Sequence, residues 1–262
     1  MEFQYVLMEV KDHVAYITLN NPQKRNPINI DTGRELKECF DRCDYDESIR
    51  LVVIRGAGGT FSAGGDINAM KARIDAGIRG TRPVCRMLGE AFLRLRNVKK
   101  PTIAYIEGSA AGAGLSLALA CDFQIADEAA KCLFAFVNLG FVPDSGATYF
   151  VTRAVGTTRA TELFMSGKVF TGRDAEQWGL FTKAVPAAEL EETVQKYIKK
   201  YANGPTVSYA NIKTMINRAQ FDRYSDGMQT EIELQGMCEE TDDFKEAVNA
   251  FLEKRKPNFQ GR

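Results

Sequence analysis

Two short runs hold the residue types that could do chemistry. Residues 109–115 read Ser-Ala-Ala-Gly-Ala-Gly-Leu, so a ligand atom could approach the backbone N–H groups there without meeting a bulky side chain. Residues 139–146 place one carboxylate, Asp144, among uncharged neighbours. Backbone donors and one isolated acid suit a reaction in which the carbon beside a carbonyl loses a proton.

The composition excludes several other classes of protein. The 262 residues carry 34 basic and 34 acidic side chains, whereas a nucleic-acid binder usually has a basic excess. No apolar run approaches the ~20 residues that span a bilayer. The start, residues 1–4, has no basic segment followed by an apolar core, so we expect no signal peptide. We therefore expect one large core in a cytoplasmic protein that binds neither nucleic acid nor membrane.

Histidine and cysteine are poorly placed for catalysis or metal binding. The one histidine, His13, lies in a predicted hairpin turn, so Ser-His-Asp machinery can hardly be built. Six cysteines are scattered without a paired framework, and Cys39 and Cys43 have no second pair to complete a metal site. We expect reduced thiols and no metal. Acid–base work then falls to carboxylates, Lys, Tyr or Cys.

Strand and helix patterns alternate along the chain, which predicts an α/β fold with largely parallel strands. Strands are expected at 3–9, 14–19, 51–54, 101–106 and 123–126. Helices are expected at 31–44 (with Asp31 as N-cap), 83–98, 157–166, 172–178, 188–202, 205–219, 222–239 and 243–254.

Asn203-Gly204-Pro205 is the strongest boundary signal. It divides a core of residues 1–203, which would hold the site, from a helical region of residues 204–262. A helical region of this size cannot bury its apolar faces alone. It must dock on the core, on a sister subunit, or on both.

Several motifs in order resemble the crotonase, or enoyl-CoA hydratase/isomerase, superfamily over nearly the whole chain. They occupy residues 19–22, 61–67, 108–114, 120–122 and 251–259. The resemblance implies a crotonase-like spiral of ββα units with a C-terminal helical trimerisation region. It also implies a homotrimer or hexamer, and an acyl-CoA thioester as substrate with no other cofactor.

The resemblance also assigns residues. It places the two backbone N–H donors of the oxyanion hole on Ala63 and Ala113. It places Asp66 in a coenzyme A-binding loop, with Ala63 and Ile67 near the adenine. Arg25 is expected to bind the coenzyme A phosphates. So is Lys254, which would reach in from the tail of its own or a neighbouring subunit.

The expected reaction depends on a departure from the family pattern. The two glutamates with which hydratases activate water correspond here to Ser116 and Phe136, so ordinary hydration is disfavoured. Asp144 lies where isomerase branches place their single acid. The chain most resembles the ring-1,2-epoxyphenylacetyl-CoA isomerase and Δ3-Δ2-enoyl-CoA isomerase branches. One carboxylate suffices to move a double bond, and apolar neighbours would raise its pKa.

Other readings of the same residues stay open at this stage. The scaffold could support hydration with one acid and another partner, or hydrolysis with Asp144 as nucleophile. It could also be a non-catalytic acyl-CoA-binding trimer, with the Asp144 side chain only capping a helix near Ser145. We also expect Asp122 to hold a helix end, and residues 68–82 to form a mobile segment over the acyl pocket.

Overall fold

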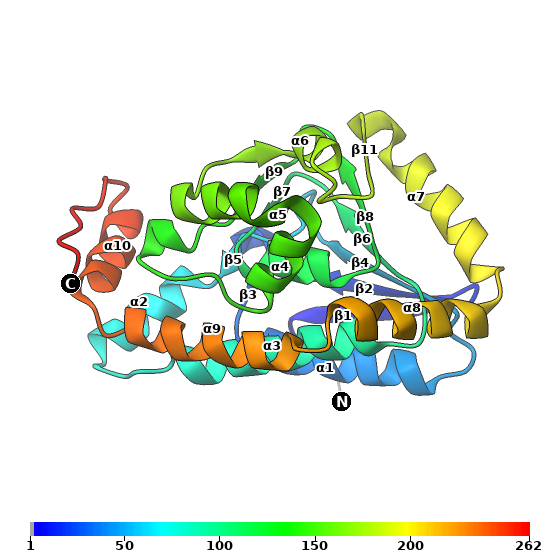
Figure 1. Cartoon of the computed structure of the whole chain (residues 1–262), viewed down its shortest axis with the longest axis horizontal. Coiled ribbons are helices and arrows are strands. Elements are labelled where there is room, and N and C mark those ends of the chain that lie inside the picture. Colours follow the sequence, from blue (N-terminus) through cyan, green and yellow to red (C-terminus); the bar gives the residue numbers. More distant parts are fainter. Residues whose placement is uncertain (1–2) are drawn as a thin grey trace.

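The computed structural model describes residues 3–262 and is organised around a six-stranded sheet (Figure 1). Met1 and Glu2, at the start where no signal peptide is expected, lie outside the described residues. The first two strands pair antiparallel and all later neighbours pair parallel. In spatial order the strands are β1 (Val6–Lys11), β2 (Val14–Leu19), β4 (Leu51–Gly56), β6 (Thr102–Ile106), β8 (Phe123–Asp127) and β11 (Lys183–Val185).

Both faces of this sheet are covered, which explains the continuous apolar strands. Leu51 and Val53 of β4 belong to the cluster packed against α7 (Ala187–Ala202). Val52 and Ile54, on the opposite face because side chains alternate along a strand, join the larger core with α1 (Ile30–Tyr45) and α3 (Thr81–Asn97).

Two small sheets bring distant loops together. In one, β3 (Pro27–Ile28) pairs with β5 (Gly64–Gly65); in the other, the order is β10 (Phe170–Thr171), β9 (Lys131–Leu133) and β7 (Ser109–Ala111). A single bridge joins Ser62 to Ala110, and the Ala111 N–H donates to the Ser62 carbonyl oxygen at 3.0 Å. The motifs near residues 63 and 112 therefore lie side by side.

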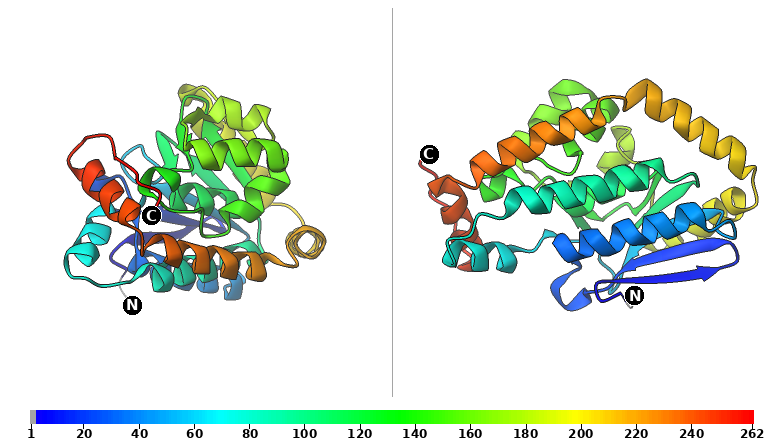
Figure 2. Two further views of the ribbon diagram at one scale, coloured as in Figure 1. Left: turned by 60° about the vertical axis from the view of Figure 1, so that its left-hand side comes forward. Right: turned by 90° about the horizontal axis from the view of Figure 1, so that it is seen from below.

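The remaining helices surround this centre. They are α2 (Ile67–Asp75), α4 (Ala113–Ala120), α5 (Ala147–Ser166), α6 (Gly172–Gln177), α8 (Thr206–Gln220), α9 (Tyr224–Cys238) and α10 (Asp242–Leu252). Figure 2 shows α9 lying along α3, which in turn lies along α1, while α10 packs against α2. The C-terminal helices thus dock on the core of their own chain. Among the described residues, no helix is both long and apolar enough to cross a membrane.

The predicted α/β fold and its parallel sheet are confirmed, and seven of the eight predicted helices begin within two residues of their predicted starts. Asn29, not Asp31, caps α1, because its side chain accepts from the Thr32 N–H in a capping box. The helix expected from residue 157 begins at Ala147 and is broken by non-helical backbone at Gly156. The sequence pattern therefore identified only the part beyond the break.

Asp122 does not hold a helix end as expected. Its carboxylate accepts from the Thr102 N–H at 3.0 Å and forms ion pairs with Lys213 at 2.8 Å and Arg96 at 3.2 Å. Lys213 is 93% buried and comes from α8, so this network fastens the C-terminal region to the sheet and α3. The partners are far apart in sequence, which is why local patterns did not indicate them.

We predict that Lys213→Ala lowers the free energy of unfolding by about 3 kcal/mol, because it removes one partner of a buried ion network. Urea unfolding followed by circular dichroism measures this change. Lys256→Ala, at an exposed lysine near the chain end, is the control and should be neutral. A neutral Lys213→Ala would contradict a fastening role for the network.

Candidate active site

Close contact between the two glycine-rich loops sets the geometry of the site. A Cβ on Gly64, whose φ is +87°, would lie 2.7 Å from the Ala111 carbonyl oxygen. A Cβ on Gly114 would lie 2.5 Å from the Ser62 side chain. Both contacts are shorter than non-bonded atoms tolerate, so glycine is required at both positions.

The N-terminus of α4 points its free donors into this junction. α4 begins at Ala113, and its N-cap, Gly112, offers no side chain to bind the first N–H groups. The first turn of a helix has N–H groups without intrahelical partners, and they favour negative charge. Ala113 lines a large cavity between these loops and α2 and α3. The predicted donor role of Ala113 therefore fits the geometry.

The N–H of Ala63, the other predicted oxyanion donor, has a backbone partner in this structure. The Ala63 N–H donates to the Arg25 carbonyl oxygen at 2.8 Å, so it is already engaged. The Gly64 N–H donates to the Ser62 hydroxyl at 3.1 Å. Gly65 is the next residue, and it lines the cavity opposite α4. Ala63 also lines this cavity, so its role as the second donor stays a prediction.

A cavity of about 580 Å³ connects these groups. Of the residues predicted from sequence, Arg25, Ala63, Asp66, Ile67, Ala113 and Asp144 all line it. Much of its wall is apolar, from side chains that include Ile28, Met70, Val84, Leu88, Leu133, Phe136 and Phe141. A mostly apolar cavity with a few convergent polar groups is typical of a small-molecule site.

Asp144 is the buried acid of this cavity. It is 93% buried, in the loop before α5. Its Oδ1 accepts from the Ser145 hydroxyl at 2.9 Å. Its Oδ2 accepts from the Cys85 thiol at 3.2 Å and from the Gln235 amide at 3.1 Å. The carboxylate is thus held by donors from three separate segments of the chain.

Burial raises the pKa of the Asp144 carboxyl above its usual range, and the three hydrogen bonds oppose that rise. A higher pKa makes the carboxylate a stronger base. The alternative in which the Asp144 side chain caps a helix does not hold. The N-cap of α5 is Gly146, and only the Asp144 backbone carbonyl accepts from this turn, from the Ala147 N–H at 3.0 Å.

The other two carboxylates that line the cavity have different roles. Asp66 is the N-cap of α2 and accepts from the Ala69 N–H at 3.2 Å. Asp31 is about half exposed and pairs with Arg34 on α1. Neither is buried, so Asp144 is the best-placed base among the acids of the cavity wall.

The positions that correspond to hydratase glutamates cannot supply a second acid. Ser116 is fully buried, and its hydroxyl contacts the carbonyl oxygens of Gly112 and Asp144 at 3.3 and 3.4 Å. Phe136 lines the cavity, with its ring 4.0 Å from where a Gly112 Cβ would stand. The wall facing the α4 N-terminus is therefore apolar.

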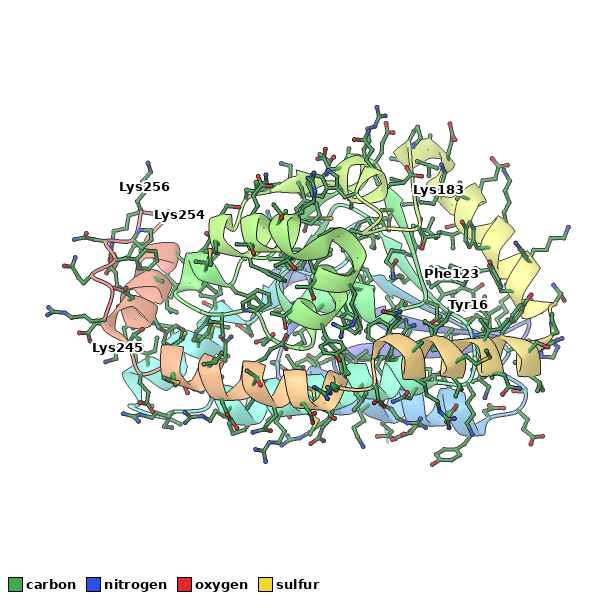
Figure 3. All side chains as sticks on the ribbon, viewed as in Figure 1. Tyr16, Phe123, Lys183, Lys245, Lys254 and Lys256 are labelled. Carbon is green, nitrogen blue, oxygen red and sulfur yellow. The ribbon has the colours of Figure 1, made fainter. Side chains whose placement is uncertain are left out.

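The two basic residues expected to bind phosphates are placed differently. Arg25 lines the cavity. Lys254 is exposed beyond the end of α10 and does not belong to the cavity wall of its own chain (Figure 3). Its contact with coenzyme A, from its own or a neighbouring subunit, stays a prediction. Residues 68–82, expected as a mobile cover, form α2 and the turn that leads to α3.

Sequence reasoning missed three residues around Asp144: Cys85, Gln235 and Glu231. Cys85 lies on the buried face of α3, where apolar spacing indicates only a core position. Gln235 and Glu231 lie about 90 residues after the loop that holds Asp144 and precedes α5, which we call the acid loop. No local pattern relates these two residues to it. Burial raises the pKa of Glu231 to about 7, although three donors near the start of α5 oppose this.

Comparison with known proteins agrees with this arrangement. Residues 9–262 match the family model described as enoyl-CoA hydratase/isomerase. The chain is 34% identical to a trans-2-decenoyl-[acyl-carrier-protein] isomerase from Streptococcus mutans, over 100% of both chains. It is also 34% identical to a 1,2-epoxyphenylacetyl-CoA isomerase from Escherichia coli, over 99% of both chains.

A solved structure gives the same picture of the fold. A crystal structure of an enoyl-CoA hydratase from Mycobacterium avium subsp. paratuberculosis superposes with a TM-score of 0.90 at 30% identity. The match covers 99% of this chain and 100% of that one, which confirms the crotonase-like fold. The chain belongs to the enoyl-CoA hydratase/isomerase family.

Proposed function

We propose that this protein is an acyl-CoA isomerase that moves a carbon–carbon double bond from the Δ3 to the Δ2 position, or an equivalent bond of a ring-derived acyl group. The observation that carries the proposal is the single buried carboxylate, Asp144, in a cavity whose Ser116 and Phe136 positions hold no second acid. The two relatives with isomerase names support the same choice.

The reaction begins with proton transfer to Asp144. The carboxylate takes a proton from C2, beside the thioester carbonyl, and the electron pair of that C–H bond forms a dienolate. The same carboxyl group then returns the proton to C4, and the double bond moves to C2–C3. No water is consumed, so a single acid suffices.

Backbone donors lower the energy of the dienolate. Its negative charge is on the thioester oxygen, which would lie near the Ala113 N–H and the loop of residues 63–65. The N-terminal dipole of α4 adds to this field. These groups accelerate the reaction because they interact more strongly with the developing oxyanion than with the neutral carbonyl.

The rest of the substrate follows from the cavity wall. An acyl chain suits the apolar side chains of α2 and α3, and Arg25 is placed for a coenzyme A phosphate. Asp66 and Ile67 lie in the predicted adenine-binding segment. In a homotrimer or hexamer, Lys254 of another subunit would contribute to phosphate binding.

We predict that Asp144→Asn abolishes isomerisation, lowering kcat by about 10² to 10⁴, because the amide cannot accept the C2 proton. The assay mixes protein with a 3-enoyl-CoA and follows the absorbance of the conjugated enoyl thioester. Binding of a saturated acyl-CoA should be nearly unchanged, because the amide keeps the size of the carboxyl group. A variant that retains native turnover would refute Asp144 as the base.

The alternatives give different products in the same assay. In H₂¹⁸O, a hydratase would place the label in a hydroxyacyl product, and hydrolysis would place it in a free acid or in Asp144. The isomerase incorporates none, since no water enters the product. Oxygen-18 in the product would contradict the proposal.

The pH dependence of kcat/KM tests the state of Asp144. Only the ionised carboxylate accepts a proton, and burial raises its pKa above the usual 3.8. Activity should therefore increase with pH through an acid limb whose midpoint lies above 3.8. A midpoint at or below that value would contradict a desolvated base.

A further inference from the structure

Gln235, on α9, forms hydrogen bonds to the acid loop with both polar atoms of its side-chain amide, Nε2 and Oε1. Its Nε2 donates to Asp144 Oδ2 at 3.1 Å, and its Oε1 accepts from the Val142 N–H at 3.0 Å. Gln235 is 99% buried, so no solvent competes for either bond. One side chain therefore holds both the loop backbone and the carboxylate.

Glu231, one helical turn earlier on α9, holds the far end of the same loop. Its carboxylate accepts from the Gly146 N–H at 2.7 Å, from the Thr148 N–H at 3.0 Å and from the Thr148 hydroxyl. The pair has i, i+4 spacing, which places both side chains on one face of the helix. Tyr224 joins this face, and its hydroxyl donates to the Ser145 carbonyl oxygen at 3.4 Å.

The loop needs such support because its own backbone is strained. Ser145 adopts a left-handed conformation with a φ of 59°, which is uncommon for a residue other than glycine. The turn also contains Gly146, with a φ of 81°. Such a conformation persists only where surrounding contacts over-determine it, and α9 provides those contacts.

We propose that Glu231 and Gln235 are positioning residues: Glu231 holds the loop, and Gln235 orients the Asp144 carboxylate and stabilises its ionised form. This inference rests on the proposed function. It extends the catalytic site into the C-terminal helical region, so residues 204–262 would serve the chemistry as well as assembly.

The role of Gln235 as donor determines the sign of its effect. Nε2 bonds the charged form of Asp144 better than the neutral form, so it favours ionisation. The other titratable groups that face this loop are Cys85 on α3, and Tyr224 and Glu231 on α9. Burial raises the pKa values of the Cys85 thiol and the Tyr224 hydroxyl, so both stay neutral through the acid limb. It raises the pKa of Glu231 to about 7, and because Glu231 is unchanged in the Gln235 variants, a difference between their profiles and the native profile reports the change at Gln235.

The experiment compares Gln235→Met and Gln235→Glu with the native protein. Methionine keeps the length of the side chain but forms neither bond, so the acid limb of kcat should move up by about one pH unit. Gln235 also lines the cavity, so a positioning role predicts that kcat and its pH profile change more than KM. Glutamate can still accept from the Val142 N–H, but it places a second negative charge beside Asp144. Its acid limb should therefore move at least as far.

Controls separate this effect from misfolding and from failure of the proposed function. Gln229→Met alters an exposed glutamine of α9 that bonds Glu233, and it should leave the pH profile unchanged. Thermal unfolding and saturated acyl-CoA binding show whether each variant is folded. Asp144→Asn is run in parallel, and if it stays active then the proposed function itself fails.

Two results would overturn the inference while leaving the proposed function intact. If Asp144→Asn is inactive but folded Gln235→Met has the native pH profile and kcat, Gln235 positions nothing. If Gln235→Met is impaired and Gln235→Glu matches the native protein, the side chain only holds the loop and does not stabilise the ionised carboxylate.

Discussion

The site depends on burial of one carboxylate in an apolar cavity. Ionising Asp144 there is costly unless donors replace the water it loses. Ser145, Cys85 and Gln235 supply three donors from three different parts of the chain. In the proposed mechanism, they keep the carboxylate ionised and available as a base, while burial raises its pKa. Helices α3 and α9 must therefore lie against the acid loop for the chemistry to be possible.

The proposed oxyanion site is held in a different way. Its proposed donors are backbone N–H groups, which require a fixed loop geometry and no particular side chain. That geometry comes from close contact between the loops at Gly64 and Gly114, where any larger residue would force the backbones apart. The carboxylate of Asp144 is thus held by hydrogen bonds from side chains. The proposed backbone donors are held by close steric contact between the two loops.

Much of this arrangement could be predicted from sequence where the signals are local. The hairpin around His13 and the buried strand at Leu51 follow from patterns of a few residues. The family resemblance also led to Asp144 and Ala113. The donor role of Ala63 stays a prediction, because a motif gives the loop and not the partners of its N–H groups.

What could not be predicted depends on contacts between distant segments. Glu231 binds the N–H groups at the start of α5, so nothing near residue 147 indicated a helix start there. In the sequence, Gln235 and Lys213 are polar residues of predicted helices, and nothing beside them marks either as special. They gain their roles only when α8 and α9 pack against the core.

The most direct test of the single-acid mechanism follows the proton itself. A 3-enoyl-CoA carrying deuterium at C2 is converted in a single turnover in ordinary water, and the position of the label in the product is read by mass spectrometry and NMR. One buried carboxylate that accepts and returns the same proton predicts that part of the deuterium appears at C4. Complete loss of the label to solvent, or a product hydroxylated at C3, would contradict it.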